Sequence, residues 1–226
     1  MSEDLYLMEE AGSRETSPRP FLEVTDLWLK VHKMTDVFFA REAGRANAKN
    51  TLVSVLILSI VSAVLSVAYS LIQASPSWLP AEYRDLWANA MAPGVCSVCT
   101  GLLATLGGFY LNSALVYVGA RLFGGRGDFT TQTYLQSLYT VPIGVLSGLL
   151  ALVPLLGCLF PLALALFSAV LAVRAVKAAH DLTTGRAIAA VSTPAAIALL
   201  FICIASIALA VVGASLWDVI KDMPIG

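Results

Sequence analysis

The chain has 226 residues, of which 58% are hydrophobic and 13% charged, and its formal net charge is −1. Soluble proteins carry roughly a quarter of charged residues, so this composition indicates an integral membrane protein that has the lipid bilayer as its main surroundings. The near-neutral charge leaves no basic field, which excludes a nucleic-acid-binding protein.

The N-terminal 49 residues divide into two parts. Residues 1–20 are acidic and then rich in Ser and Pro, which predicts a disordered tail. In residues 21–49, apolar positions recur at helical spacing, among them Leu27, Val31 and Met34, with Lys and Arg between them. This pattern predicts one amphipathic helix lying on the cytosolic membrane surface, since its charges would be costly at the bilayer centre. Two alternatives stay open: a helix packed on protein, and a lid over the cytosolic loops described below.

Four long runs without Asp, Glu, Lys or Arg follow, at residues 50–81, 86–120, 129–173 and 187–217. One helix crosses the bilayer with about 20 residues, so the third run is long enough for two spans, with a break at Leu152–Gly157 that contains Pro and Gly. The predicted spans are Thr51–Ile72, Val95–Val118, Thr133–Val153, Leu155–Ala175 and Ala187–Trp217. We therefore expect an all-α integral membrane protein, with a five-transmembrane-helix bundle over residues 50–217 and a short external tail at 218–226.

The distribution of Lys and Arg predicts the orientation. Twelve of the 14 basic residues fall before the first span, in the loop after the second span, or at the end of the fourth span and in the loop after it, and only Arg84 and Lys221 fall on the other side. Cytosolic loops carry an excess of Lys and Arg. The N-terminus is therefore predicted to be cytosolic and the C-terminus outside.

Small residues in the spans predict helix packing. Gly144 and Gly148 form a G-x-x-x-G motif, and Gly107 and Gly108 give the second span a small-residue surface. Such surfaces serve packing within one chain or homo- or hetero-oligomers equally well, and the oligomeric state stays open.

The two cytosolic loops that flank the third and fourth spans are the predicted functional region. Their candidate partner-binding residues are Gly124, Gly125, Arg126, Asp128, Lys177, His180, Asp181, Thr183, Thr184 and Arg186. Asp128, Thr130 and Thr133 are also candidate N-caps of the third span, the last with Gln136 as its capping-box partner.

Four motifs in and around this hairpin are similar to a known family. They are Phe123-Gly-Gly-Arg-Gly-Asp-Phe129, Tyr139-Thr-Val-Pro142, Val153-Pro154-Leu-Leu-Gly157 and Val176-Lys-Ala-Ala-His-Asp-Leu-Thr-Thr-Gly-Arg-Ala187. From about Trp28 to Val212 the chain resembles the Ypt-interacting (Yip) domain family. The resemblance implies five spans, a cytosolic N-terminal region and a very short external tail.

In eukaryotes, members of that family lie in Golgi and related membranes, associate with prenylated Rab GTPases and with one another, and support vesicle traffic. The resemblance therefore implies a Golgi- or ER-type membrane if the source is a eukaryote, or the cytoplasmic membrane if it is a prokaryote. It also implies a small GTPase as one kind of cytosolic partner. This chain lacks the Gly-Pro that follows Asp-Leu-Tyr in the eukaryotic proteins, because Leu7 and Met8 follow Tyr6. In that respect it looks more like the prokaryotic branch.

The inventory of reactive residues favours a protein without catalytic residues, cofactor or metal. There are two histidines, and His180-Asp181 is the only adjacent pair suited to acid–base work, which on a loop more often caps helix ends. Cys96 and Cys99 have no second pair for a zinc site, and with Cys158 they are predicted to share one depth of the outer leaflet, where a disulfide could form. Ion-coupled transport usually leaves charged residues inside the spans.

These observations predict a non-catalytic membrane scaffold or adaptor that recruits partners or organises membrane. The alternative, from a different class, is a transporter or channel-like protein for a lipid or a small apolar solute.

Overall fold

The computed structural model describes residues 20–73 and 95–221, and in these ranges all regular structure is helical, as predicted. The elements are α2 (Phe21–Leu29), the 3₁₀ turn η1 (Val31–Lys33), α3 (Asp36–Ala43), α4 (Ala48–Gln73), α6 (Val95–Leu122), α7 (Phe129–Ala151), α8 (Pro154–His180) and α9 (Thr184–Lys221). The predicted disordered tail and most of the predicted external tail lie outside the described residues.

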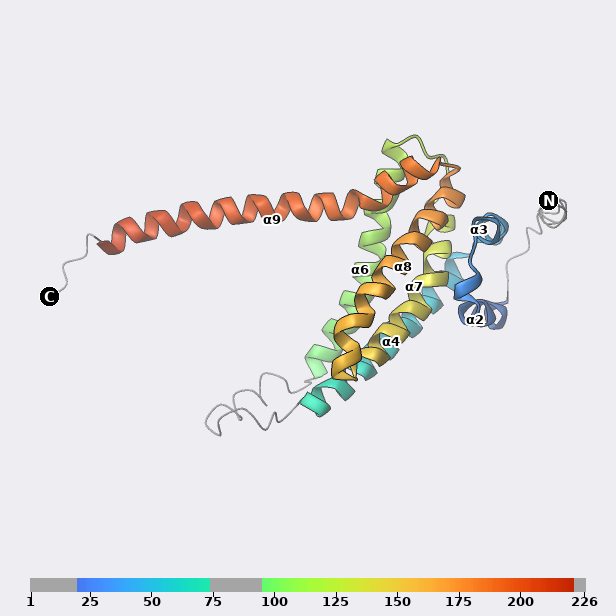
Figure 1. Ribbon diagram of the computed structural model, residues 1–226, viewed down its shortest axis with the longest axis horizontal. Coiled ribbons are helices and arrows are strands. Elements are labelled where there is room, and N and C mark those ends of the chain that lie inside the picture. The colour runs from blue at the N-terminus through green and yellow to red at the C-terminus, as the bar shows by residue number, and fades with distance from the viewer. Residues whose placement is uncertain (1–19, 74–94, 222–226) are drawn as a thin grey trace.

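Five of these helices are long and apolar enough to cross a membrane, which confirms the five-span prediction. The long uncharged run is a hairpin of α7 and α8, and the break falls where the sequence places it, because Pro154 takes the first position of α8. Proline is favoured there because its missing N–H would lack a helical partner in any case. The hairpin brings residues 123–128 and 181–183 to one end of the bundle, here called the loop end, and puts Leu152 and Val153 at the other (Figure 1).

Helix α7 is the centre of the bundle. It packs on α8 and α4 along its length and also touches α6, α2 and α3, so every residue from Gln132 to Tyr139 is buried. An added Cβ at Gly144 would lie 2.8 Å from Leu58 Cδ1, and one at Gly148 would lie 2.7 Å from Leu65 Cδ1. The G-x-x-x-G motif thus lies against α4 of the same chain, and close packing within the monomer accounts for it.

The sequence predicts that Gly107 and Gly108 of α6 pack against another helix, but in the described part of the structure no helix lies close to them. A Cβ built on either residue would meet no atom within 4 Å. Two glycines therefore leave the side of α6 open at these positions, and no neighbouring helix of the described chain approaches them closely.

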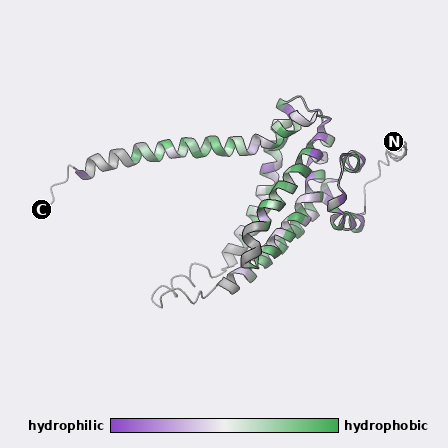
Figure 2. Cartoon of the chain, in the orientation of Figure 1, coloured by the Kyte–Doolittle hydropathy of each residue, from purple (hydrophilic) through white to green (hydrophobic). Residues whose placement is uncertain are grey.

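Helix α9 begins in the bundle and then leaves it. Its first turns pack on α6 and α8, with Thr193 so close to Gly119 that an added Cβ would overlap its side chain. Beyond Pro194 the helix runs away from the other spans (Figure 1), and its large side chains from Leu199 to Leu209 are exposed. Figure 2 shows that the coloured stretch in the middle of this projecting helix is mostly hydrophobic on its visible side, and the apolar span ends at Ala210. A helix without a polar face is stable in hydrocarbon.

The N-terminal segment is helical, but it is not the single helix predicted for residues 21–49. It breaks at Lys30–Met34, because Thr35 starts a new helix by accepting a hydrogen bond from the Phe38 backbone N–H (3.4 Å). Four of its apolar side chains are buried against α7 and α8: Val24, Leu27, Met34 and Phe39. The segment therefore packs on protein, while Leu22 and Leu29 stay exposed on its other side.

Candidate functional site

The structure brings the two predicted loops together at the loop end. Gly125 N–H donates to the Ala120 carbonyl (2.8 Å) and Arg126 N–H donates to the His180 carbonyl (3.3 Å), so the first loop is bonded to the end of α8. Helix α8 ends at His180 and is followed by its C-cap Asp181, whose φ of 54° is positive, unlike that of any other non-glycine residue in the described ranges. Asp is among the residues that tolerate this left-handed conformation, and it turns the chain toward α9.

Two glycines let the first loop lie directly on α8. A Cβ at Gly125 would lie 2.8 Å from the Ala120 carbonyl oxygen and 2.9 Å from His180 Cβ. A Cβ at Gly127 would overlap the carbonyl of Ala179 and lie 3.0 Å from His180 Nδ1. Each of the two positions meets a backbone carbonyl of its neighbour, so no rotamer change would make room. The Gly-rich loop is therefore a close-packed cover over His180.

His180 points into the bundle and does not pair with Asp181. Its side chain is 1% exposed, and its Nε2 lies 2.7 Å from Gln132 Oε1, whereas Asp181 is exposed. Gln132 Nε2 in turn donates to the Ser113 carbonyl (2.8 Å), so its Oε1 faces His180 and the imidazole donates from Nε2. The chain of contacts continues to Gln136, whose Oε1 accepts from Ser113 Oγ (2.9 Å).

This row of hydrogen-bonded side chains is not among the features predicted from the sequence. The sequence predicts Gln136 only as the capping partner of Thr133, whereas Thr133 Oγ1 donates to the Phe129 carbonyl (2.9 Å) and Gln136 bonds across to α6. The sequence feature that could have predicted these contacts is the pair Gln132 and Gln136, which are four residues apart in a run without charged residues. Amides in a span usually bond across helices, and two on one face indicate a neighbouring polar group.

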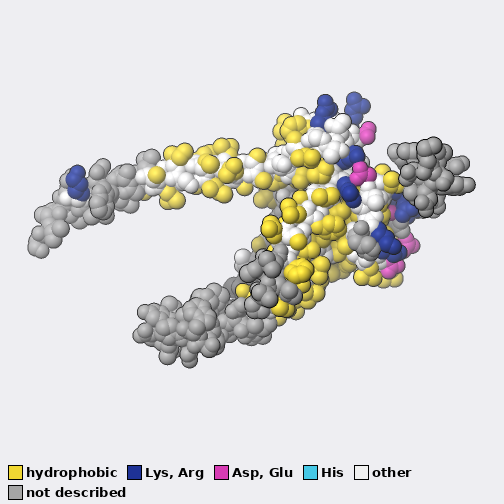
Figure 3. Space-filling model, in the orientation of Figure 1, with side chains coloured by type: hydrophobic (Ala, Val, Ile, Leu, Met, Phe, Trp, Pro, Cys, Tyr) yellow, Lys and Arg dark blue, Asp and Glu magenta, His cyan; other side chains and the backbone are white. Residues whose placement is uncertain are grey.

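Three arginines lie at or next to the first loop and the start of α9, and one of them is tied to the fold. Arg121 donates from Nε to Tyr117 Oη (2.9 Å) and from Nη1 to the Gly125 carbonyl (3.4 Å), with its guanidinium over the Tyr117 ring. Arg126 and Arg186 are exposed and make no ion pair with any carboxylate of the described residues. Lys and Arg side chains gather at this end of the molecule (Figure 3).

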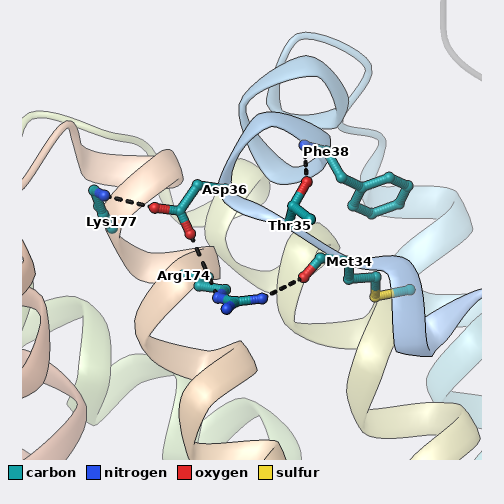
Figure 4. Close-up of polar contacts among 6 residues, drawn as sticks. All are labelled: Met34, Thr35, Asp36, Phe38, Arg174 and Lys177. Atoms are coloured by element: carbon teal, nitrogen blue, oxygen red, sulfur yellow. Dashed lines mark hydrogen bonds and ion pairs between the residues drawn. The ribbon is translucent and has the colours of Figure 1, made fainter. Parts of the chain in front are cut away.

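Lys177 belongs to a different contact. Its Nζ lies 2.6 Å from Asp36 Oδ2 of α3, and Arg174 adds an ion pair to Asp36 Oδ1 (3.5 Å) and a hydrogen bond to the Met34 carbonyl (3.0 Å) (Figure 4). Lys177 therefore holds α3 on α8, whereas Thr183 of the second loop and Thr184 and Arg186 in the first turn of α9 are exposed.

Asp128 is the N-cap of α7, as the sequence suggested. Its carboxylate accepts from the Thr131 backbone N–H (2.8 Å) and from Thr131 Oγ1 (2.6 Å). Partial burial alone would raise the pKa of Asp128, but these hydrogen bonds to the charged form outweigh it, so the pKa lies below its ordinary value. The cap is thus strongest when the carboxylate is ionised.

Asp128→Ala should destabilise the protein by about 0.5–2 kcal/mol at pH 7, the usual effect of removing an N-cap. Because the pKa is lowered on folding, the stabilisation from ionised Asp128 is complete above the unfolded pKa of about 4 and is lost as the pH falls through the folded value. Thermal unfolding in detergent should therefore separate wild type from Asp128→Ala at pH 7 and bring them closer at pH 3. Asp128→Asn, which keeps an N-cap but cannot ionise, is the control; an unchanged gap at pH 3 would contradict the assignment.

Comparison with known proteins agrees with this architecture. A family model, the Yip1 domain, matches residues 36–207, from the first residue of α3 to the projecting part of α9, and includes both loops. No curated protein matched the chain, and no solved structure did so either. Since the match covers most of the 226 residues, the chain belongs to the Yip1 domain family of multi-span membrane proteins.

Proposed function

We propose that this protein is a non-catalytic membrane scaffold that recruits a partner through its loop end, on the cytosolic side of the membrane. The observation that carries the proposal is the pair Arg126 and Arg186, which are exposed and make no ion pair within the described residues. Arg126 stands on the loop that the Gly125 and Gly127 contacts hold against α8, and Arg186 stands in the first turn of α9. A preorganised surface loses little entropy on binding.

The charges of this surface define the chemistry of the partner. Two unpaired guanidinium groups favour carboxylates or phosphates, which they can bind bidentately. A recess of about 550 Å³ lies between α3 and α8, and its lining includes both acidic and basic side chains, among them Asp36, Lys177 and Asp181. We therefore propose a cytosolic protein with an acidic contact surface; a small GTPase is one candidate, by family resemblance alone.

A catalytic role fits the loop end less well. Its imidazole, His180, is 1% exposed, lies under the Gly-rich loop and already bonds to Gln132. A general base has to reach the proton it abstracts, and a group so enclosed cannot meet a substrate at this surface. The buried polar chain is better suited to fixing the relative positions of α6, α7 and α8.

The test is capture of cytosolic proteins by the full-length chain in lipid nanodiscs, measured by quantitative mass spectrometry. The double variant Arg126→Glu/Arg186→Glu should lose partners that wild type retains, because like charges would then face an acidic surface. Raising the ionic strength should weaken wild-type capture as well, since exposed charge pairs are screened.

The matched control is Lys30→Glu/Lys33→Glu, which makes the same charge change on two exposed residues of the N-terminal segment. It should keep the partners. Equal capture by wild type and both variants, or equal loss in both variants, would contradict recruitment through Arg126 and Arg186.

A further inference from the structure

A cavity of about 800 Å³ lies inside the membrane domain and extends from Gln132, near the loop end, to Thr140 in the middle of α7. Helices α4, α6, α7 and α8 and the start of α9 surround it. Helix α6 packs on α4 and α9 and α8 packs on α7 and α9, but α6 and α8 have little contact with each other. Because α9 leaves the bundle beyond Pro194 (Figure 1), it closes only the loop end of the gap between α6 and α8.

The wall of the cavity is apolar with a polar stripe. Gln132, Gln136 and Thr140 follow one another at four-residue spacing on α7, and all three line the cavity. A smaller cavity of about 250 Å³ shares Thr140 and Ser168 with it and continues along α7 to Ser147. Helix α7 thus carries a line of polar side chains on the side that faces the two cavities, here called the α7 stripe: Gln132, Gln136, Thr140 and Ser147.

Two side chains of this wall lack a protein partner. Asn112 of α6 and Ser168 of α8 line the cavity and make no hydrogen bond with any described residue. An amide left unpaired in hydrocarbon costs several kcal/mol, about the cost of a lost hydrogen bond in an apolar medium. A ligand with hydrogen-bonding groups would satisfy both residues.

The lining also contains no Asp, Glu, Lys, Arg or His among the described residues. A charged headgroup would therefore lose its hydration without gaining a counter-ion. We infer that the cavity binds a single uncharged amphiphile, with hydroxyl or amide groups of its head on Asn112, Ser168 and the α7 stripe. Its hydrocarbon chains leave between α6 and α8 into the bilayer. This inference is independent of partner recruitment at the loop end.

A transmembrane helix of a second copy is the rival occupant, because it could also bond to Asn112. A helix about 10 Å wide that crosses about 30 Å of hydrocarbon occupies on the order of 2,000 Å³. The cavity has less than half of that volume, but it lies within the roughly 300–1,000 Å³ of ordinary ligand pockets. Size therefore favours a small amphiphile.

The experiment uses the full-length protein in liposomes that contain a diazirine-bearing diacylglycerol as the probe, with labelled peptides mapped by mass spectrometry. Wild type should be labelled on α6, α7 and α8 around the cavity. Phosphatidic acid with the same diazirine chains should label these positions much less, because its headgroup is charged. Equal labelling by the two lipids would overturn the proposal of an uncharged ligand.

Neighbouring glycines provide a matched pair of blocking variants. A Cβ at either Gly107 or Gly108 meets nothing within 4 Å, but only Gly108 lines the cavity. Gly108→Phe should fill the space and reduce diacylglycerol labelling to background, while Gly107→Phe should leave it at the wild-type level. Equal labelling of the two variants would overturn the site.

Asn112→Leu removes the polar contact without breaking a bond in the protein, so it should reduce labelling by about two- to tenfold, the effect of one lost hydrogen bond. Unchanged labelling would overturn the placement of the head on Asn112. A different result would assign the cavity to an oligomer. In that result the wild type cross-links to a second copy, Asn112→Leu does not, and lipid labelling is the same in both; it would overturn the proposal.

Discussion

Gly127→Ala should destabilise the protein more than any other single methyl group added to the loop end. The new Cβ would overlap the Ala179 carbonyl oxygen and lie 2.6 Å from the carbonyl carbon, both part of the α8 backbone. Overpacking usually costs about 1–3 kcal/mol, and more where the neighbour cannot move. Thermal unfolding of the purified protein in detergent, followed by circular dichroism, should show a lowered midpoint.

Gly185→Ala is the matched control, because it adds the same methyl group near the start of α9, where a Cβ meets nothing within 4 Å. It should be neutral or slightly stabilising, since alanine favours helix over glycine. If Gly127→Ala unfolds at the wild-type temperature, the Gly-rich loop does not lie on α8. The preorganised surface proposed for partner recruitment would then lose its structural basis.

Phe39→Ala is expected to release α3 from the bundle. Phe39 is fully buried and meets the Tyr139 ring of α7 edge-on, with centroids 6.4 Å apart. Truncating a buried Phe to Ala costs about 3–5 kcal/mol, whereas the exposed ion pairs of Asp36 each contribute about 0–1 kcal/mol. The ion pairs therefore cannot hold α3 alone. Limited trypsin digestion should cut faster after Arg41 and Arg45.

Val37→Ala removes apolar atoms from the same helix at a residue that is 48% exposed, and it should leave the digestion rate unchanged. Equal digestion of wild type and Phe39→Ala would mean that α3 is not held by its contact with α7. Binding of the N-terminal segment to the membrane surface would then be better supported than its packing on α7 and α8. The outcome thus separates packing on protein from packing on lipid, the alternatives that amphipathic spacing alone leaves open.

Features that depend on local sequence could be predicted. The five spans follow from runs without charge, since the cost of burying a charge in hydrocarbon applies to each residue independently of the fold. The hairpin break at Pro154 and the cap at Asp128 involve groups within three residues of each other. Adjacency of the two loops followed from the hairpin, because two antiparallel spans return the chain to one side.

The tertiary structure alone decided which side of each helix faces which neighbour. Lys177 and Asp36 are 141 residues apart, and His180 and Gln132 are 48 apart, so no local pattern relates them. The spans are apolar on nearly every side, so their composition does not specify their rotation about the helix axis. That rotation places His180 under the Gly-rich loop and the α7 stripe on a cavity. Number, order and ends of the spans are thus properties of the sequence, whereas the loop-end surface and the cavity exist only because the helices pack with one particular set of faces together.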